Sequence, residues 1–228
     1  MVDTKVLIGV TTQEYSRRAD FYDYLNLLAK PSNTILAYSH NRSPAKGRNV
    51  LIEAAIANRC SHVLLVDDDM VPNREALYQL LDHDVSIVSG LYFNRAYPHI
   101  PLAFDVASDD GSALPIYLTD NMPRLTRIVA AGLGFVLIKT EVFSDLEKPW
   151  IRIGELDPEE WCDDMGFFHR VNQKGIPMWL DTQCCVGHMG TMIIRPNYVD
   201  GKWYAGYDTA GKGSVNISME IPEPAEKT

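Results

Sequence analysis

Three consecutive carboxylates, Asp67, Asp68 and Asp69, follow directly on an apolar run that starts after His62. The residues of that run, 63–66, do not alternate with polar ones, which is typical of a strand buried on both faces. The acids would then lie at the carboxyl edge of a sheet, where open α/β folds bind ligands. Packed carboxylates repel one another unless a positive charge joins them, and a divalent cation supplies one. The alternative is one helix cap and two solvated loop residues.

A second acidic pair, Asp163 and Asp164, begins a stretch whose apolar residues recur at helical spacing. Phe167, Phe168 and Val171 would form one buried face, and a glycine at 175 would end the helix. Carboxylates in a first helical turn interact favourably with the helix dipole. The pair therefore has two interpretations, as helix caps or as acids that act on a ligand.

A single histidine, His188, lies between two glycines near the end of the apolar part of the chain. A lone histidine is more often a surface residue or a satisfied core residue than a ligand. Imidazole is nonetheless a common metal ligand, so His188 stays a candidate.

Strands and helices alternate through the first half of the sequence, which favours a parallel sheet with right-handed crossovers. The expected strands there are Val6–Val10, Thr34–Tyr38, the run after His62 and Val85–Val88, with helices at Asp20–Lys30, Val50–Arg59 and Glu75–Leu81. After Gly90 the pattern becomes mixed, with a hairpin of residues 102–106 and 116–118. Later elements are strands at 127–131, 135–139 and 178–180 and a short helix at 141–146.

Polar loops follow the first two strands, so both are expected to border the carboxyl edge beside Asp67. The first contains Thr11, Thr12 and Glu14, and the second, residues 39–49, contains Arg42 and Arg48. We predict that Arg48 lies near a bound nucleotide through a charge-assisted hydrogen bond, against the alternative of a solvated arginine at a helix start.

The segment from Leu91 to Pro101 is too irregular for a regular element and too aromatic for a linker. Its rings, Tyr92, Phe93, Tyr97 and His99, are of the kind on which sugars stack. The segment is therefore either a loop that faces an acceptor or aromatic packing beneath an irregular loop.

Bulk composition excludes several classes of protein. Of 228 residues, 46% are hydrophobic and 22% charged, which is ordinary for a soluble globular protein. A net charge of −9 argues against nonspecific nucleic-acid binding. The sequence has no apolar run long enough for a transmembrane segment and no signal peptide at its start. The spacing of its cysteines favours reduced thiols, and hence a cytoplasmic protein.

Taken in order, these stretches resemble nucleotide-sugar glycosyltransferases of the GT-A fold, and among them glycosyltransferase family 2. The resemblance runs from Val6 to Gly190. It rests on the polar loop after the first strand, Gly47-Arg48-Asn49, the Asp67-Asp68-Asp69 motif, the segment 132–135, the helix start with Asp163 and Asp164, and the segment around His188. It implies a GT-A-like (Rossmann-like) α/β fold with a mixed, mainly parallel sheet flanked by helices.

The resemblance also implies roles. Asp67 and Asp69 correspond to the outer acids of the D-x-D motif, which contacts the ribose and holds Mn²⁺ or Mg²⁺, and His188 to a late metal ligand. Asp164 corresponds to the general base of inverting members, with Asp163 beside it as the second catalytic candidate. The nucleotide would be bound by Thr11, Thr12, Glu14, Arg42, Arg48, Asp67 and Asp68.

The implied activity moves a sugar from a UDP- or GDP-sugar to the hydroxyl of a glycan or other acceptor. Such a reaction needs the diphosphate's charge neutralised and the acceptor hydroxyl deprotonated, and the sequence has a candidate group for each task. The chain departs from the family at Asp163, where Glu is more usual, and at Gly166, where an acid is frequent. It lacks the Q-x-x-R-W signature and membrane helices of processive synthases, which implies a single-addition enzyme.

Three alternatives remain open. A haloacid-dehalogenase-like phosphatase expects Thr where Val71 stands, and a receiver domain is about half this length. The third is a nucleotide- or sugar-binding module without activity. For the organisation of the chain, we expect one domain over residues 1–205, with a nucleotide-binding half 1–90 and an acceptor-binding half 91–205. A polar, flexible tail is expected over 206–228.

Overall fold

The computed structural model describes residues 4–12, 19–40, 42–95, 99–106, 113–153, 163–190, 193–208 and 214–217. Its helices are α1 (Ala19–Leu27), α2 (Pro44–Ala57), α3 (Ala76–Leu81), the 3-10 helix η1 (Thr140–Ser144) and α4 (Asp164–Gln173). None of these helices has both the length and the apolar composition that crossing a membrane requires.

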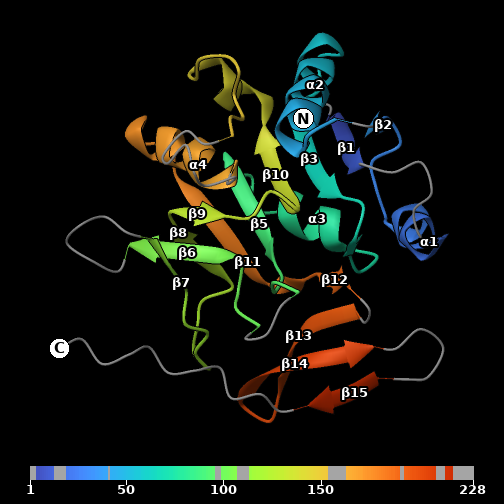
Figure 1. Ribbon diagram of the computed structural model, residues 1–228, viewed down its shortest axis with the longest axis vertical. Helices are drawn as coiled ribbons and strands as arrows, with labels where there is room; N and C mark the ends of the chain where they lie inside the picture. The colour runs from blue at the N-terminus through green and yellow to red at the C-terminus, as the bar shows by residue number, and fades with distance from the viewer. Residues whose placement is uncertain are drawn as a thin grey trace.

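The largest sheet has the strand order β2-β1-β3-β10-β5-β11-β8. Its strands are β1 (Val6–Thr12), β2 (Ile35–His40), β3 (His62–Asp67), β5 (Ile87–Leu91), β8 (Leu125–Ile128), β10 (Phe135–Lys139) and β11 (Met178–Cys185). Strands β2, β1 and β3 are mutually parallel and β11 is parallel to β5, whereas β10 and β8 run antiparallel to their neighbours. This topology confirms the predicted α/β class with a mixed, mainly parallel sheet flanked by helices (Figure 1).

Helices cover both faces of this sheet. Apolar residues of α2 and α4 pack in one hydrophobic cluster with one face, and residues of α1 and α3 pack in a second cluster with the other. Strand β3 contributes to both, since Val63 and Leu65 belong to the first cluster and Leu64 and Val66 to the second. The apolar run before the acidic triplet is therefore a strand buried on both faces, as its lack of alternation predicts.

A second sheet, in the order β15-β14-β13-β12-β4, lies below the first in the view of Figure 1. Its strands are β4 (Met70–Val71), β12 (Gly187–Met189), β13 (Ile193–Val199), β14 (Lys202–Asp208) and β15 (Ser214–Ile217). Residues 206–208 and 214–217, which we expected in a flexible tail, belong to paired strands instead. A tight turn with positive φ at Asp200 and Gly201 joins β13 to β14 and allows the chain to return.

A third, small sheet contains β6 (Ala103–Val106), β7 (Ala113–Pro115) and β9 (Ala130–Ala131). The predicted hairpin is present, but its second strand is 113–115 and not 116–118; of the expected residues, Ile116 donates its amide to the Ala103 carbonyl at 2.9 Å. Ile116 and Leu118 are buried instead in the core that α2 and α4 cover. Residues 107–112, which join these two strands, lie outside the described residues.

The predicted start of α2 is wrong. Helix α2 begins at Pro44, inside the segment expected to be a polar loop, because proline's fixed φ suits the first helical turn and its missing N–H costs nothing there. Helix α3 begins at Ala76, one residue after its predicted start, and follows a turn in which the Asn73 side chain accepts a hydrogen bond from the Glu75 amide. The expected stop at Gly175 is confirmed by its φ of +69°.

A buried carboxylate, Asp181 of β11, ties three elements together. It accepts hydrogen bonds from His83 Nε2 at 2.8 Å, after α3, and from Arg124 Nη2 at 3.0 Å, ahead of β8. The Gln183 amide donates to it as well. Burial alone would raise the pKa of Asp181, but the hydrogen bonds from Arg124, His83 and this amide lower it.

Replacing Asp181 with Asn should therefore lower the free energy of unfolding by about 2 kcal/mol at pH 7, since it breaks a buried ion pair whose arginine keeps partial solvent access. The carboxylate's contribution is present above its unfolded pKa near ~3.9 and is lost as the pH falls through the lower folded value. Urea unfolding should then show that the wild type and Asp181→Asn differ less in free energy of unfolding at pH 3 than at pH 7. Asp145→Asn, at an exposed position, is the control. An Asp181→Asn protein as stable as the wild type at pH 7 would contradict this role.

Candidate functional site

Arg48 joins the end of β3 to the start of α4. Its Nη2 lies 2.8 Å and 2.9 Å from the two carboxylate oxygens of Asp67, and its Nη1 lies 2.7 Å from Asp163 Oδ2. Only 5% of the arginine is exposed, because it lies in the first turns of α2 against the sheet. Arg48 is therefore neither solvated nor turned outward, and it fixes two acids that are 96 positions apart in the sequence (163 − 67).

Negative charge at this edge exceeds what Arg48 balances. Burial by itself would lower the pKa of Arg48, but Asp67 and Asp163 more than offset it and raise that pKa. The pKa of Asp67 is nevertheless raised, first by burial and then by the charges of Asp69 and Asp163, against the opposing effect of Arg48. The edge therefore favours a further positive charge.

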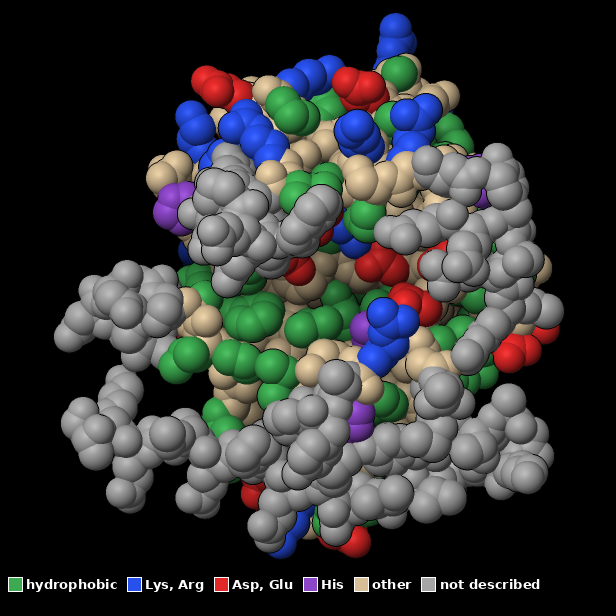
Figure 2. Space-filling model, in the orientation of Figure 1, with side chains coloured by type: hydrophobic (Ala, Val, Ile, Leu, Met, Phe, Trp, Pro, Cys, Tyr) green, Lys and Arg blue, Asp and Glu red, His purple; other side chains and the backbone are tan. Residues whose placement is uncertain are grey.

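Asp69 lies in the turn after β3 and faces two nitrogen-bearing side chains. Its Oδ2 is 3.0 Å from Arg95 Nη1, and its Oδ1 is 3.6 Å from His188 Nε2. Backbone pairing sets this arrangement, since β4 pairs with β12 and the Met189 amide donates to the Asp69 carbonyl at 2.7 Å. Figure 2 shows acidic side chains near the middle of one face of the molecule, with a basic side chain and a histidine beside them.

The tautomer of His188 follows from its other nitrogen. Nδ1 lies 2.8 Å from the carbonyl oxygen of Phe93, which can only accept, so Nδ1 carries the proton. In the neutral ring, Nε2 is then an unprotonated nitrogen that faces Asp69 Oδ1. Such a hydrogen bond is the usual way in which a protein orients a metal-ligating histidine.

Asp69 and His188 could thus provide two ligands for a divalent cation. Asp67, the third predicted ligand, is turned to Arg48, and no group of three or more His, Cys, Asp or Glu side chains in the described ranges is arranged to hold a metal ion. Two protein ligands nonetheless suit an ion that substrate phosphates complete, as is common for Mg²⁺ in nucleotide sites. The donor set of one carboxylate and one imidazole also suits Mn²⁺.

The ends of β1 and β2 place further polar atoms next to Asp67. Thr11 pairs in register with both Asp67 and Ser39. The hydroxyls of Thr11 and Ser39 are buried, and neither has a hydrogen-bond partner among the residues that the structure describes. Buried hydroxyls normally have partners, so these two are unsatisfied polar atoms beside Asp67.

The other predicted nucleotide-binding residues are placed as follows. Thr12 and Asp68 are buried, at 1% and 6% exposure, and Arg42 is exposed ahead of α2. Within the described residues, no ion pair joins Arg42 to the acidic side chains. Glu14 lies outside the described residues.

The two acids at the start of α4 differ in surroundings. Asp163 occupies the N-cap position, yet its side chain makes no capping hydrogen bond and pairs with Arg48 instead. Asp164 is the first helical residue, and its Oδ1 accepts a hydrogen bond from the Met165 amide. The interpretation of Asp163 as a helix cap is therefore wrong.

The aromatic segment after β5 is mostly packing where it is described. Tyr92 and Phe93 are buried at 2% and 1% exposure, so their rings offer no face to a sugar. The Tyr92 hydroxyl accepts a hydrogen bond from the Gly134 amide, and burial raises its pKa. His99 is partly buried beside the Asn94 carbonyl, and Tyr97 lies outside the described residues.

Sequence reasoning missed two features of this site. Strand β4 is only two residues long and gives no periodicity, although it sets Asp69 against His188. Arg95 belongs to the irregular segment after β5, and its positive charge is the one signal in the sequence that could identify it as a partner of the acidic motif.

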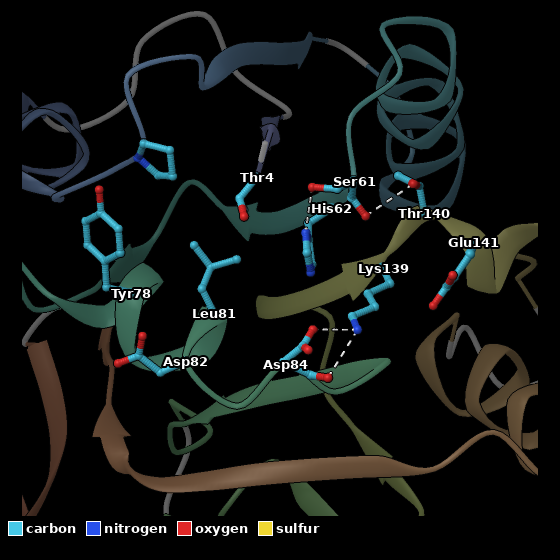
Figure 3. Close-up of a pocket in the computed structure, with 11 residues that line it drawn as sticks. Thr4, Ser61, His62, Tyr78, Leu81, Asp82, Asp84, Lys139, Thr140 and Glu141 are labelled. Atoms are coloured by element: carbon cyan, nitrogen blue, oxygen red, sulfur yellow. Dashed lines mark hydrogen bonds and ion pairs between the residues drawn. The ribbon is translucent and has the colours of Figure 1, made fainter. Parts of the chain in front are cut away.

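A cavity of about 800 Å³ lies away from these acids (Figure 3). Its lining comes from the start of β3, the end of β10 and the end of α3, where Lys139 pairs with Asp84 at 2.7 Å and Ser61 contacts His62 at 2.9 Å. These are the opposite ends of the strands from Asp67. None of the predicted site residues lines it, so cavity size does not mark the candidate site.

Comparisons with known proteins concern the fold. The sequence matches no protein-family model, and a search of curated proteins gave no similar sequence. Among solved structures, A197 from STIV has a TM-score of 0.56 at 12% identity, over 98% of this chain and 100% of that chain. The likeness to A197 supports the α/β fold.

Two structures of S. aureus TarS, residues 1–349, were also found. The one in complex with UDP-GlcNAc has a TM-score of 0.47 at 12% identity, over 78% of this chain and 56% of that chain. The other has a TM-score of 0.45 at 13% identity, over 78% and 60%.

Proposed function

We propose that this protein is a metal-dependent glycosyltransferase that moves a sugar from a UDP- or GDP-sugar to an acceptor hydroxyl, with inversion and by single additions. One observation carries the proposal. Three segments on which the family resemblance rests lie at one edge of the sheet. Arg48 joins the acidic turn after β3 to the acidic start of α4. The pairing of β4 with β12 brings His188 beside that turn.

On the donor side, Thr11 and Ser39 offer hydroxyls beside Asp67. The carboxylate of Asp67, which Arg48 holds through both oxygens, would accept hydrogen bonds from ribose hydroxyls through its remaining lone pairs. Arg48 thereby orients the nucleotide through Asp67, and its buried guanidinium serves as a positioning group.

Asp69 and His188 would hold Mn²⁺ or Mg²⁺. When bound, the ion neutralises the charge of the diphosphate that leaves the sugar. Without a cation, the negative charge of a diphosphate would be repelled by the carboxylates of Asp67 and Asp69. The protein's part is to hold Asp69 Oδ1 and His188 Nε2 3.6 Å apart, through the pairing of β4 with β12.

On the acceptor side, Asp164 is the proposed general base. The general base is a carboxylate that accepts a proton from the acceptor hydroxyl. Asp163 is the weaker candidate, because its Oδ2 already accepts a hydrogen bond from Arg48 at 2.7 Å. Asp164 is the first residue of the same helix, and its Oδ1 accepts a hydrogen bond from the Met165 amide.

A phosphatase of the haloacid-dehalogenase type fits less well. It would use the first acid of the motif as a nucleophile, but Asp67 is held by Arg48 through both oxygens. Val71 pairs with Gly187 and offers no hydroxyl. A module that binds sugar nucleotides without turnover would share the whole donor side and is separated only by measuring turnover.

The test is the metal dependence of nucleotide binding. Calorimetry with UDP and with GDP should show binding in Mn²⁺ and little in chelator, because the anionic edge repels a bare diphosphate. Asp69→Asn should lose most of this difference, while Asp145→Asn, at an exposed position, should retain it. Equal affinities in Mn²⁺ and in chelator for the wild type would sink the proposal.

A further inference from the structure

Asp69 has a resident cationic neighbour. Arg95 Nη1 lies 3.0 Å from Asp69 Oδ2, while the opposite oxygen faces His188. The Arg95 side chain is 53% exposed, whereas those of Asp69 and His188 are 16% and 10% exposed. Of the three, Arg95 is therefore the partner on the solvent side, and it can leave without opening the core.

We propose that Arg95 is the counter-ion of Asp69 in the metal-free protein, that a divalent cation displaces it, and that the released guanidinium binds the diphosphate of the donor. This inference rests on the proposed function and deepens it. It assigns Arg95 two alternating anionic partners, one in the protein and one in the substrate.

Competition follows from charge. A divalent cation on Asp69 and His188 would neutralise the carboxylate that holds Arg95 and would repel the guanidinium. An ion pair with a half-exposed arginine is weak, typically ~0–1 kcal/mol, so a cation can displace it. Arg95 and a divalent cation therefore compete for the carboxylate of Asp69.

The destination of Arg95 follows from where its backbone is anchored. Arg95 comes two residues after Phe93, whose carbonyl orients His188. Phe93 is bridged to Pro101, and the Asn94 amide donates to the Ile100 carbonyl at 3.0 Å. The same anchored segment thus positions a metal ligand and the arginine, so a released Arg95 side chain stays beside any metal-bound diphosphate.

A guanidinium suits that second partner. Its planar fork of N–H donors matches phosphate oxygens and can donate two parallel hydrogen bonds. Arg48, the other arginine at this edge, is fixed between Asp67 and Asp163. Arg95, half-exposed and paired with Asp69, can turn to a substrate.

The test uses Arg95→Met, which keeps an apolar stem and removes the charge. Free Mn²⁺, measured by its electron paramagnetic resonance signal without nucleotide, should show roughly 5-fold tighter binding to Arg95→Met than to the wild type, because the competitor is gone. In saturating Mn²⁺, calorimetry should show UDP and GDP binding roughly 10-fold more weakly to the variant, because a charge-assisted contact is lost. A higher affinity for Mn²⁺ together with a lower affinity for nucleotide identifies an exchange of partners, since general damage to the fold would lower both affinities.

Arg59→Met is the matched control. It removes the same charge just beyond the far end of α2, and it should change neither affinity. Arg95→Lys keeps the charge without the fork and should restore wild-type Mn²⁺ binding but only part of the nucleotide affinity.

Three failures are distinguishable. If the wild type binds Mn²⁺ in a manner that Asp69→Asn abolishes, yet Arg95→Met binds it equally well, the exchange is overturned and the proposed function stands. If neither the wild type nor Arg95→Met binds Mn²⁺, the metal site of the proposed function falls and the exchange falls with it. Tighter Mn²⁺ with unchanged nucleotide affinity would overturn the diphosphate as the destination of Arg95.

Discussion

Asp164→Asn is expected to slow the release of nucleoside diphosphate from the sugar nucleotide that the wild type uses by about 10²–10⁴-fold, the usual cost of removing a general base. Asn has the same shape and can still accept the hydrogen bond from the Met165 amide. The variant should therefore remain folded and bind nucleotide with Mn²⁺ as before. Turnover rates and calorimetric affinities of the same preparations check both parts.

Asp163→Asn is the neighbouring control. Because Asp163 pairs with Arg48, its loss should lower stability and leave more turnover than the loss of Asp164. A dead Asp163→Asn beside an active Asp164→Asn would move the base by one residue. If both variants turn over substrate at the wild-type rate, the base lies elsewhere and the inverting mechanism loses its support.

The second large effect is expected at Arg48. Arg48→Met leaves Asp67 and Asp163 close together without their shared partner, and breaking a buried ion pair in this way typically costs ~3–5 kcal/mol. The free energy of unfolding, measured with urea, should fall accordingly. Arg48→Lys should recover only part of it, because one ammonium cannot reproduce the fork that spans both carboxylates.

A double variant separates the ion pair from simple packing loss. Adding Asp163→Asn to Arg48→Met removes one of the two stranded charges, so the pair of substitutions should cost less than the sum of the single ones. Two results would contradict the bridging role. One is that the free energies of unfolding lost in the two single variants add up, to within ~0.5 kcal/mol, to the loss in the double variant. The other is an Arg48→Met protein as stable as the wild type.

The sequence predicted the large sheet well where hydrophobic pattern alone decides the structure. A strand buried on both faces must be apolar throughout, so the run at 63–66 identified β3. The acids that end it then had to lie at a sheet edge. The helix over Phe167, Phe168 and Val171 followed from the same kind of periodicity.

Pairing between distant segments could not be predicted in this way. The position of His188 beside Asp69 depends on β4 and β12, which are two and three residues long, too short to show a period. Their pairing is a tertiary effect, as is the seating of Asp163 on Arg48, 115 positions earlier in the chain.

Two interpretations failed because a residue type has more than one stable use. An aromatic ring can bind sugar or fill a core, and Tyr92 and Phe93 fill the core. An acid at a helix start can cap it or pair with a cation, and Asp163 pairs with Arg48. The burial of the side chain decides between these uses, and burial cannot be predicted from the neighbouring residues in the sequence.

The central claim is that the edge around Asp67, Asp69, Asp164 and His188 transfers sugar from a nucleoside diphosphate. Phosphorus NMR of the protein with a panel of UDP- and GDP-sugars and hydroxyl acceptors in Mn²⁺ tests it most directly. The account predicts that at least one sugar nucleotide is converted to its nucleoside diphosphate by the wild type, and that Asp69→Asn and Asp164→Asn both abolish most of the conversion. Conversion that persists in chelator or in both variants would contradict it.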